Sequence, residues 1–132
     1  MASISIGARH EHKLLVTSDV AIDFLGLESA RVLATPHLVW NLEIACRDLL
    51  KTMLEDGFDS VGTDVNVKHL AATPLGMSVT FHAEIVHLDG NRVRFKVEAY
   101  DEKEKISSGT HERYIVDIAR FATRVAAKAA GR

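Results

Sequence analysis

Residues 35–57, TPHLVWNLEIACRDLLKTMLEDG, carry the one long helical pattern of the chain. Apolar side chains recur in this stretch at three- and four-residue spacing, which is typical of a helix that buries a wide face. Pro36 suits the first helical turn, Thr35 suits the N-cap, and Gly57 suits the end. The stretch therefore predicts a central helix whose buried stripe consists of Leu38, Leu42, Ala45, Cys46, Leu49, Leu50, Met53 and Leu54.

After Gly57 the hydrophobic period changes from about 3.6 to about 2 residues, which indicates strands. Asp89-Gly90-Asn91 is a tight-turn signal, so the strands on either side of it form an antiparallel hairpin. A short strand precedes the helix. The predicted strands cover residues 13–16, 61–69, 77–85, 93–99 and about 106–118.

The alternating strands each present an apolar face that needs a cover, and the long helix is the element available to provide it. We therefore predict an α+β chain with a hotdog fold, in which a curved antiparallel sheet wraps around one long central helix. Residues 1–132 are interpreted as a single domain, because no linker or repeat interrupts them. The unpaired edges of such a sheet predict a homodimer.

Composition excludes several classes of partner. Lys and Arg number 16 against 18 Asp and Glu, a net charge of −2, so no broad basic field exists to attract a nucleic acid. No apolar stretch approaches the ~20 residues that cross a bilayer, and the first residues lack the order of a secretory signal. We expect no membrane partner and a cytoplasmic location, which the single cysteine, Cys46, fits.

Glu43 is the first candidate functional residue. At ~100° per residue it falls inside the apolar arc of the helix, between Val39 and Leu50, and it is the only charged residue there. Burying an ionised carboxylate costs several kcal/mol unless the group is paired. Glu43 is thus either a structural carboxylate, at the rim or in a salt bridge, or a catalytic one.

His69 ends a predicted strand just before the turn at residues 71–76, a place where functional side chains are often displayed. It is either a proton donor or acceptor, or a structural histidine. Thr35 lies about 12 Å from Glu43 along the helix axis, at ~1.5 Å per residue, so the two cannot hydrogen-bond within one helix. Either they flank a substrate from two ends, or the chain folds Thr35 back.

The remaining motifs are weak. Arg120, Arg124 and Lys128 recur every fourth residue and predict a short amphipathic helix whose cationic face is either solvated or binds a polyphosphate such as coenzyme A. Motifs of the HEXXH, GxGxxG, GxxxxGK[ST] and GxSxG types are missing from the sequence. We expect no metal and no cofactor.

Three stretches resemble the fluoroacetyl-CoA thioesterase family and its hotdog relatives. They are AT at 34–35 leading to EIAC at 43–46, VGT at 61–63 leading to VKHLAATP at 67–74, and GTHER at 109–113. They span most of the chain, and the HxAATPxG and GTHER segments are the most specific. The resemblance implies an acyl-CoA thioesterase that hydrolyses a thioester to a free acid and coenzyme A.

The resemblance also implies the site. The family's catalytic threonine, glutamate and histidine fall on Thr35, Glu43 and His69, an amide donor to the thioester oxygen falls on Gly62, and an arginine tied to the site falls on Arg113. Glu43 is then the attacking group or the general base. The threonine orients water or the acyl group, and the histidine polarises the thioester or assists the thiolate. We expect this site at the dimer interface.

Two points remain open from the sequence. Residues 24–33 differ from the segment that caps the acyl pocket in the fluoroacetyl enzyme, so fluoroacetate selectivity is not carried over. The alternatives to a thioesterase are a noncatalytic acyl-CoA-binding hotdog module and a hotdog dehydratase or hydratase. Release of free coenzyme A distinguishes a thioesterase from these two alternatives.

Overall fold

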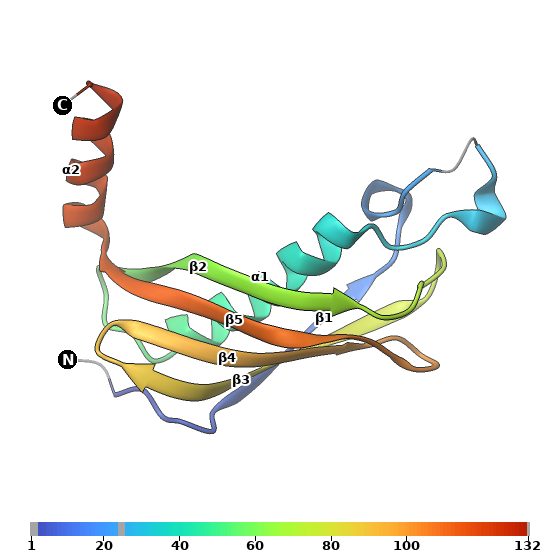
Figure 1. The fold of residues 1–132 in the computed structure, drawn as a ribbon, viewed down its shortest axis with the longest axis horizontal. Coiled ribbons are helices and arrows are strands. Elements are labelled where there is room, and N and C mark those ends of the chain that lie inside the picture. The colour runs from blue at the N-terminus through green and yellow to red at the C-terminus, as the bar shows by residue number, and fades with distance from the viewer. Residues whose placement is uncertain (1–2, 24–25, 132) are drawn as a thin grey trace.

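A five-stranded antiparallel sheet and two helices make up the protein, in a computed structural model that describes residues 3–23 and 26–131 (Figure 1). The strands lie side by side in the order β1-β3-β4-β5-β2, with β1 and β2 at the two edges. Two 3-10 turns, Ser18–Val20 and Glu28–Ala30, lie between β1 and the first helix. The elements are β1 Arg9–Leu15, α1 Thr35–Lys51, β2 Phe58–His69, β3 Ser78–Asp89, β4 Arg92–Tyr100, β5 Lys105–Asp117 and α2 Ile118–Ala129.

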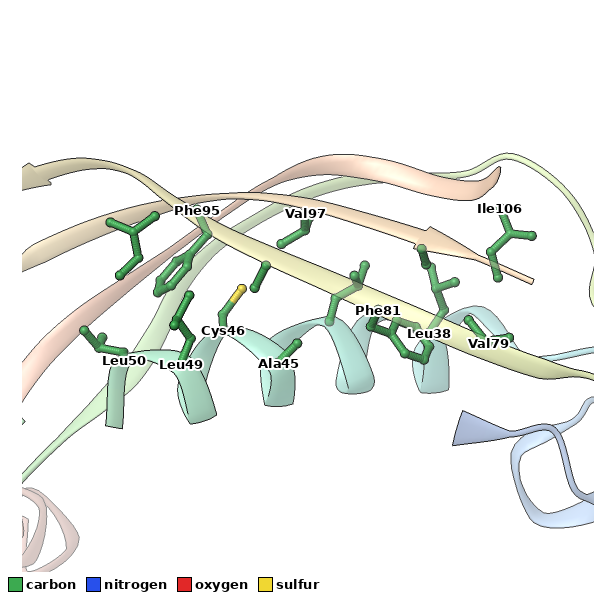
Figure 2. Packing of buried hydrophobic residues seen from close by; sticks show 14 of the residues in the cluster. Leu38, Ala45, Cys46, Leu49, Leu50, Val79, Phe81, Phe95, Val97 and Ile106 are labelled. Atoms are coloured by element: carbon green, nitrogen blue, oxygen red, sulfur yellow. The ribbon is translucent and has the colours of Figure 1, made fainter. Parts of the chain in front are cut away.

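The core lies between α1 and the concave face of the sheet. Figure 2 shows Leu38, Ala45, Leu49 and Leu50 of α1 pointing toward the strands. Each fully buried leucine or phenylalanine side chain contributes about 1.5–3 kcal/mol. The alternation predicted for the hairpin is confirmed, since the buried strand residues are Val79, Phe81, Ala83 and Ile85 on β3 and Val93, Phe95, Val97 and Ala99 on β4.

Both predicted ends of the central helix need correction. Ala34, not Thr35, is the N-cap, and no side chain caps the helix; Thr35 is its first residue, followed by Pro36. The helix ends at Lys51, short of Gly57, whose φ of +88° lets the chain reverse into β2. Met53 still packs against the core from the turn, which is why the apolar pattern continues beyond the helix.

The alternation predicted for residues 61–69 is also wrong in part, because β2 contains a bulge. The register with β5 shifts between Gly62 and Asp64, so Thr63 is an extra residue and the phase of the strand changes there. Opposite residues of an antiparallel pair share a face. Gly62, Val65 and His69 therefore all lie on the helix-facing side, opposite Arg113, His111 and Ser107 of β5.

The second helix, α2, follows β5 directly and stands away from the sheet at the end where β2 begins (Figure 1). Asp117 is its N-cap and accepts a hydrogen bond from the Arg120 amide. None of its described residues is buried. The predicted cationic helix therefore exists. Over residues 3–23 and 26–131, neither helix has the length and apolar character needed to cross a bilayer.

Candidate active site

Thr35 and His69, 34 residues apart in the sequence, form a hydrogen-bonded pair. The Thr35 hydroxyl oxygen lies 2.8 Å from Nδ1 of His69. The start of α1 supplies the threonine and the last residue of β2 supplies the histidine. The Thr35 hydroxyl, which the sequence predicted to cap the helix, therefore contacts an imidazole instead.

A pocket of about 490 Å³ opens beside this pair. Ile22, Val32 and Leu70 contribute apolar walls, and the segment before α1 and the loop after β2 form two of its sides. Val32 bridges to Pro74, which ties these two segments together. Of residues 24–33, which differ from the capping segment of the fluoroacetyl enzyme, Phe24 and Leu25 lie outside the described residues. The pair therefore faces a mainly apolar cavity.

Burial lowers the pKa of His69 from its usual 6.5, and the backbone of Ala71 opposes this shift more weakly. The ring is consequently neutral at neutral pH. Two side-chain atoms in the described part of the chain, Nε2 of His69 and Oγ of Ser107, are buried without a hydrogen-bond partner. A neutral imidazole next to a hydroxyl and an apolar pocket is equipped to accept a proton from a neighbouring group.

Glu43 lies at a second centre, farther along α1. Its Oε2 atom is 3.4 Å from Nη1 of Arg113 and 3.8 Å from Nε2 of His111. The side chain of Glu43 is 35% exposed. Glu43 is therefore held in a salt bridge and still open on one side. Both features fit the structural interpretation of this carboxylate, and its catalytic role stays a prediction.

Arg113 is fixed from behind by Ser60. Its Nε donates to the Ser60 hydroxyl at 2.7 Å, and its Nη2 donates to the Ser60 carbonyl at 2.8 Å. Burial lowers the pKa of Arg113, and the Glu43 carboxylate opposes that shift. The guanidinium is thus a rigid fork that presents one edge to Glu43.

Gly62 lies against the same carboxylate. A Cβ atom at this position would be 2.5 Å from Oε2 of Glu43 and 3.2 Å from Cε1 of His111. The absence of a side chain lets the backbone of β2 approach the carboxylate, and the bulge at Thr63 turns Gly62 toward the helix. The predicted amide donor and the predicted catalytic glutamate are therefore neighbours in one chain.

The structure does not bring all predicted site residues together. Thr35 and Glu43 both lie within α1, so about 12 Å of helix axis separates them at ~1.5 Å per residue. Arg120 and Arg124 line a groove of about 580 Å³ with Phe58 and Tyr114. That groove lies at the start of β2, and the eleven steps along the strand from Phe58 to His69 span roughly 36 Å at ~3.3 Å per step.

Sequence reasoning missed three residues of these centres: Ser60, Ser107 and His111. His111 and Arg113 are two residues apart on a strand, so alternation places them on one face, and that signal was available. Ser60 and Ser107 gave no signal, because a serine in a strand is ordinary. In the described residues, no three His, Cys, Asp or Glu side chains gather as a metal site would require.

Comparison with known proteins gives consistent results. A family model described as "Fluoroacetyl-CoA-specific thioesterase" matches residues 16–119. The fluoroacetyl-CoA thioesterase of Streptantibioticus cattleyicolor is 36% identical over 129 residues, which cover 93% of each chain.

Solved structures agree with the sequence matches. One of a fluoroacetyl-CoA thioesterase superposes with a TM-score of 0.86 at 35% identity, covering 96% of this chain and 98% of that one. A Thermus thermophilus protein, described as a thioesterase superfamily member, has a TM-score of 0.87 at 30% identity over 100% of both chains. The predictions of a hotdog fold and of an acyl-CoA thioesterase are confirmed. The chain belongs to the family of fluoroacetyl-CoA-specific thioesterases, hotdog proteins that hydrolyse acyl-CoA thioesters.

Proposed function

We propose that this protein hydrolyses an acyl-CoA at a site built by two copies of the chain, with Thr35 and His69 from one copy and Glu43 and Gly62 from the other. The observation that carries this proposal is the separation of the two centres by about 12 Å of helix in a single chain. Each centre has part of what thioester hydrolysis needs. The first has a pocket with a hydroxyl and an imidazole, and the second has a carboxylate beside a backbone amide.

The free edge of β2 supports a second copy at this place. Two β2 strands that pair antiparallel about a two-fold axis at Asn66 set Val65 of one copy opposite Val67 of the other and, once the bulge residue Thr63 is passed over, Gly62 opposite His69. Val65 faces the helix side and is 40% exposed, so the pairing covers an apolar side chain near the axis. It also satisfies the backbone groups at the edge.

The same pairing suggests what the cationic residues of α2 bind. Phe58 lies four residues before Gly62, and Gly62 is opposite the last β2 residue of the other copy, so the start of β2 in one copy extends past the end of β2 in the other. Arg120 and Arg124, in the groove beside Phe58, then approach the mouth of the other copy's pocket. Two guanidinium groups there suit the phosphates of coenzyme A.

In this site Glu43 acts as the general base on a water molecule. The water oxygen bonds to the thioester carbon, its proton passes to Glu43, and the Gly62 amide stabilises the oxyanion; removing such a donor costs about 2.7–4 kcal/mol in barrier. The tetrahedral intermediate collapses by breaking the C–S bond, and the proton on Glu43 passes to the sulfur. Thr35, held by His69, orients the acyl group in its apolar pocket.

Hydrolysis is tested with a thiol reagent and a panel of short, branched, aromatic and halogenated acyl-CoAs. Free coenzyme A should appear with at least one of them, and Glu43→Gln should reduce its release by roughly 10²–10⁴-fold while the dimer stays intact. Asp48→Asn, an exposed carboxylate on the same helix, is the matched control and should keep full activity. Tight binding without release of thiol would instead identify the noncatalytic binding module.

Sharing of the site between copies is tested by complementation. Glu43→Ala and His69→Ala are each expected to be inactive. Mixed dimers obtained by co-expression contain one site with both residues intact if the site is shared, so the mixture should recover about a quarter of wild-type activity. A site within one chain predicts no recovery, since each chain then lacks one residue.

We also propose a cytoplasmic location. Cys46 is a free cysteine, buried in the core, where burial raises the pKa of its thiol. An unpaired thiol is compatible with a reducing compartment.

A further inference from the structure

We propose that His111 is a positioning residue that holds Arg113, and through it Glu43, in the geometry needed for hydrolysis. The inference rests on the proposed function, in which Glu43 is the base. It concerns a histidine that the reaction itself does not use. The side chain of His111 is 1% exposed, and its ring stacks on Phe95 with the centroids 6.1 Å apart.

The hydrogen bonds of His111 fix where its proton lies. Nδ1 is 2.8 Å from the carbonyl oxygen of Asp64. A carbonyl only accepts, so Nδ1 carries the hydrogen and donates it. Nε2 is then the unprotonated nitrogen of a neutral ring, and it accepts from Nη1 of Arg113 at 3.2 Å.

Arg113 therefore makes contacts on every edge of its fork. Nη1 lies between Nε2 of His111 and Oε2 of Glu43, at 3.2 and 3.4 Å, while Nε and Nη2 donate to Ser60. The two Ser60 contacts hold the plane of the guanidinium from one side but offer no partner to Nη1 next to Glu43. His111 adds the acceptor on the side of Nη1, so loss of this acceptor leaves Arg113, and with it the Glu43 carboxylate, less tightly held.

The bulge in β2 connects this arrangement to the backbone. The register shift falls between Gly62 and Asp64, and Asp64 supplies the carbonyl that binds His111. One irregularity thus turns Gly62 toward Glu43 and also offers an acceptor to the histidine. The groups with an electrostatic effect on the His111 ring are Arg113, Glu43 and Asp64, and burial together with the Arg113 charge lowers its pKa.

The first test reads the ring directly in the native full-length protein. Nitrogen-15 NMR of the imidazoles at pH 7, with His111→Gln used for assignment, should give His111 a protonated Nδ1 and a bare Nε2. A ring protonated on Nε2, or on both nitrogens, would overturn the proposal. This readout does not depend on turnover, so it remains decisive if the protein proves not to hydrolyse acyl-CoA.

The second test separates positioning from folding. His111→Leu should lower kcat by about 10- to 100-fold with KM changed less than about threefold, since a misplaced base slows the chemistry and not the binding. His111→Gln keeps one donor and one acceptor and should recover most of kcat. His82→Leu, a half-exposed histidine on β3, is the control for loss of an imidazole.

If His111→Leu does not fold, the kcat values of His111→Gln and His111→Glu test the positioning role instead. Glutamate has acceptors but offers no donor to the Asp64 carbonyl at neutral pH. The positioning role would be contradicted if kcat fell as far in His111→Gln as in His111→Glu. It would also be contradicted if the substitutions changed KM alone.

Discussion

Gly62 and Glu43 approach so closely that a methyl group on the glycine α-carbon would lie 2.5 Å from the carboxylate oxygen Oε2. The contact joins a strand at the sheet edge to the central helix and depends on the bulge that turns Gly62 inward. The position of the carboxylate therefore depends on a residue that has no side chain.

Gly62→Ala should lower activity strongly and leave the protein folded. The atom in the way is the end of a flexible side chain, so Glu43 moves aside and the backbone does not. We expect kcat to fall by about 10²-fold, because displacing a catalytic group by about 1 Å costs that much, with a change in unfolding free energy below about 1 kcal/mol. Kinetics and urea denaturation measure both. Full activity in Gly62→Ala would mean that Glu43 does not need its present position.

Arg113→Lys should destabilise the fold despite keeping the charge. Lysine has no planar fork and cannot replace both hydrogen bonds to Ser60, so the expected loss is roughly 2 kcal/mol. Arg92→Lys is the control, since Arg92 is 59% exposed and 3.8 Å from Glu112, and its change should stay below about 0.5 kcal/mol. Urea denaturation measures both losses of unfolding free energy. Equal losses in the two variants would mean that the hydrogen bonds of the buried guanidinium do not stabilise the fold.

Acid should weaken the fold as the pH drops below 6.5. Burial lowers the pKa of His69 in the folded state, whereas in the unfolded chain it takes up a proton near 6.5. Between these two values the unfolded chain binds more protons, so the free energy of unfolding falls with falling pH and levels off below the folded pKa.

Urea unfolding at pH 7.5 and 5.5, at one fixed protein concentration, measures this loss of stability. His69→Gln removes one titrating group and should show a smaller loss than the wild type. If the wild type and His69→Gln lose the same stability, a histidine other than His69 causes the pH dependence.

Reversing the charges of Arg120 and Arg124 to Glu should raise KM for acyl-CoA more than it lowers kcat. The two guanidinium groups line the groove beside Phe58, at the opposite end of β2 from His69, so in the proposed dimer they bear on binding of the phosphates. Lys128→Glu is the matched control, because Lys128 lies on the same helix and is not among the residues that line the groove. An unchanged KM would indicate an ordinary solvated helix face.

The sequence by itself determined the elements and the layers. A stripe at helical spacing and four segments of period two fix which side chains must be covered, and burial of those faces leaves few arrangements. It also identified Glu43 as an anomaly and His69 as a strand end. These conclusions follow from local periodicity, which is contained in short windows of the chain.

Only the tertiary structure decided which side chains meet in the site, because the same local sequence is compatible with more than one set of contacts. A threonine before a proline can cap a helix or bind a distant side chain, and the place of His69, 34 residues away, selected the second. A single bulge residue, Thr63, reversed the phase of β2 and turned Gly62 toward Glu43. Hydrogen bonds such as that between Arg113 and Ser60, 53 residues apart, exist only once the strands have paired, and no local pattern encodes them.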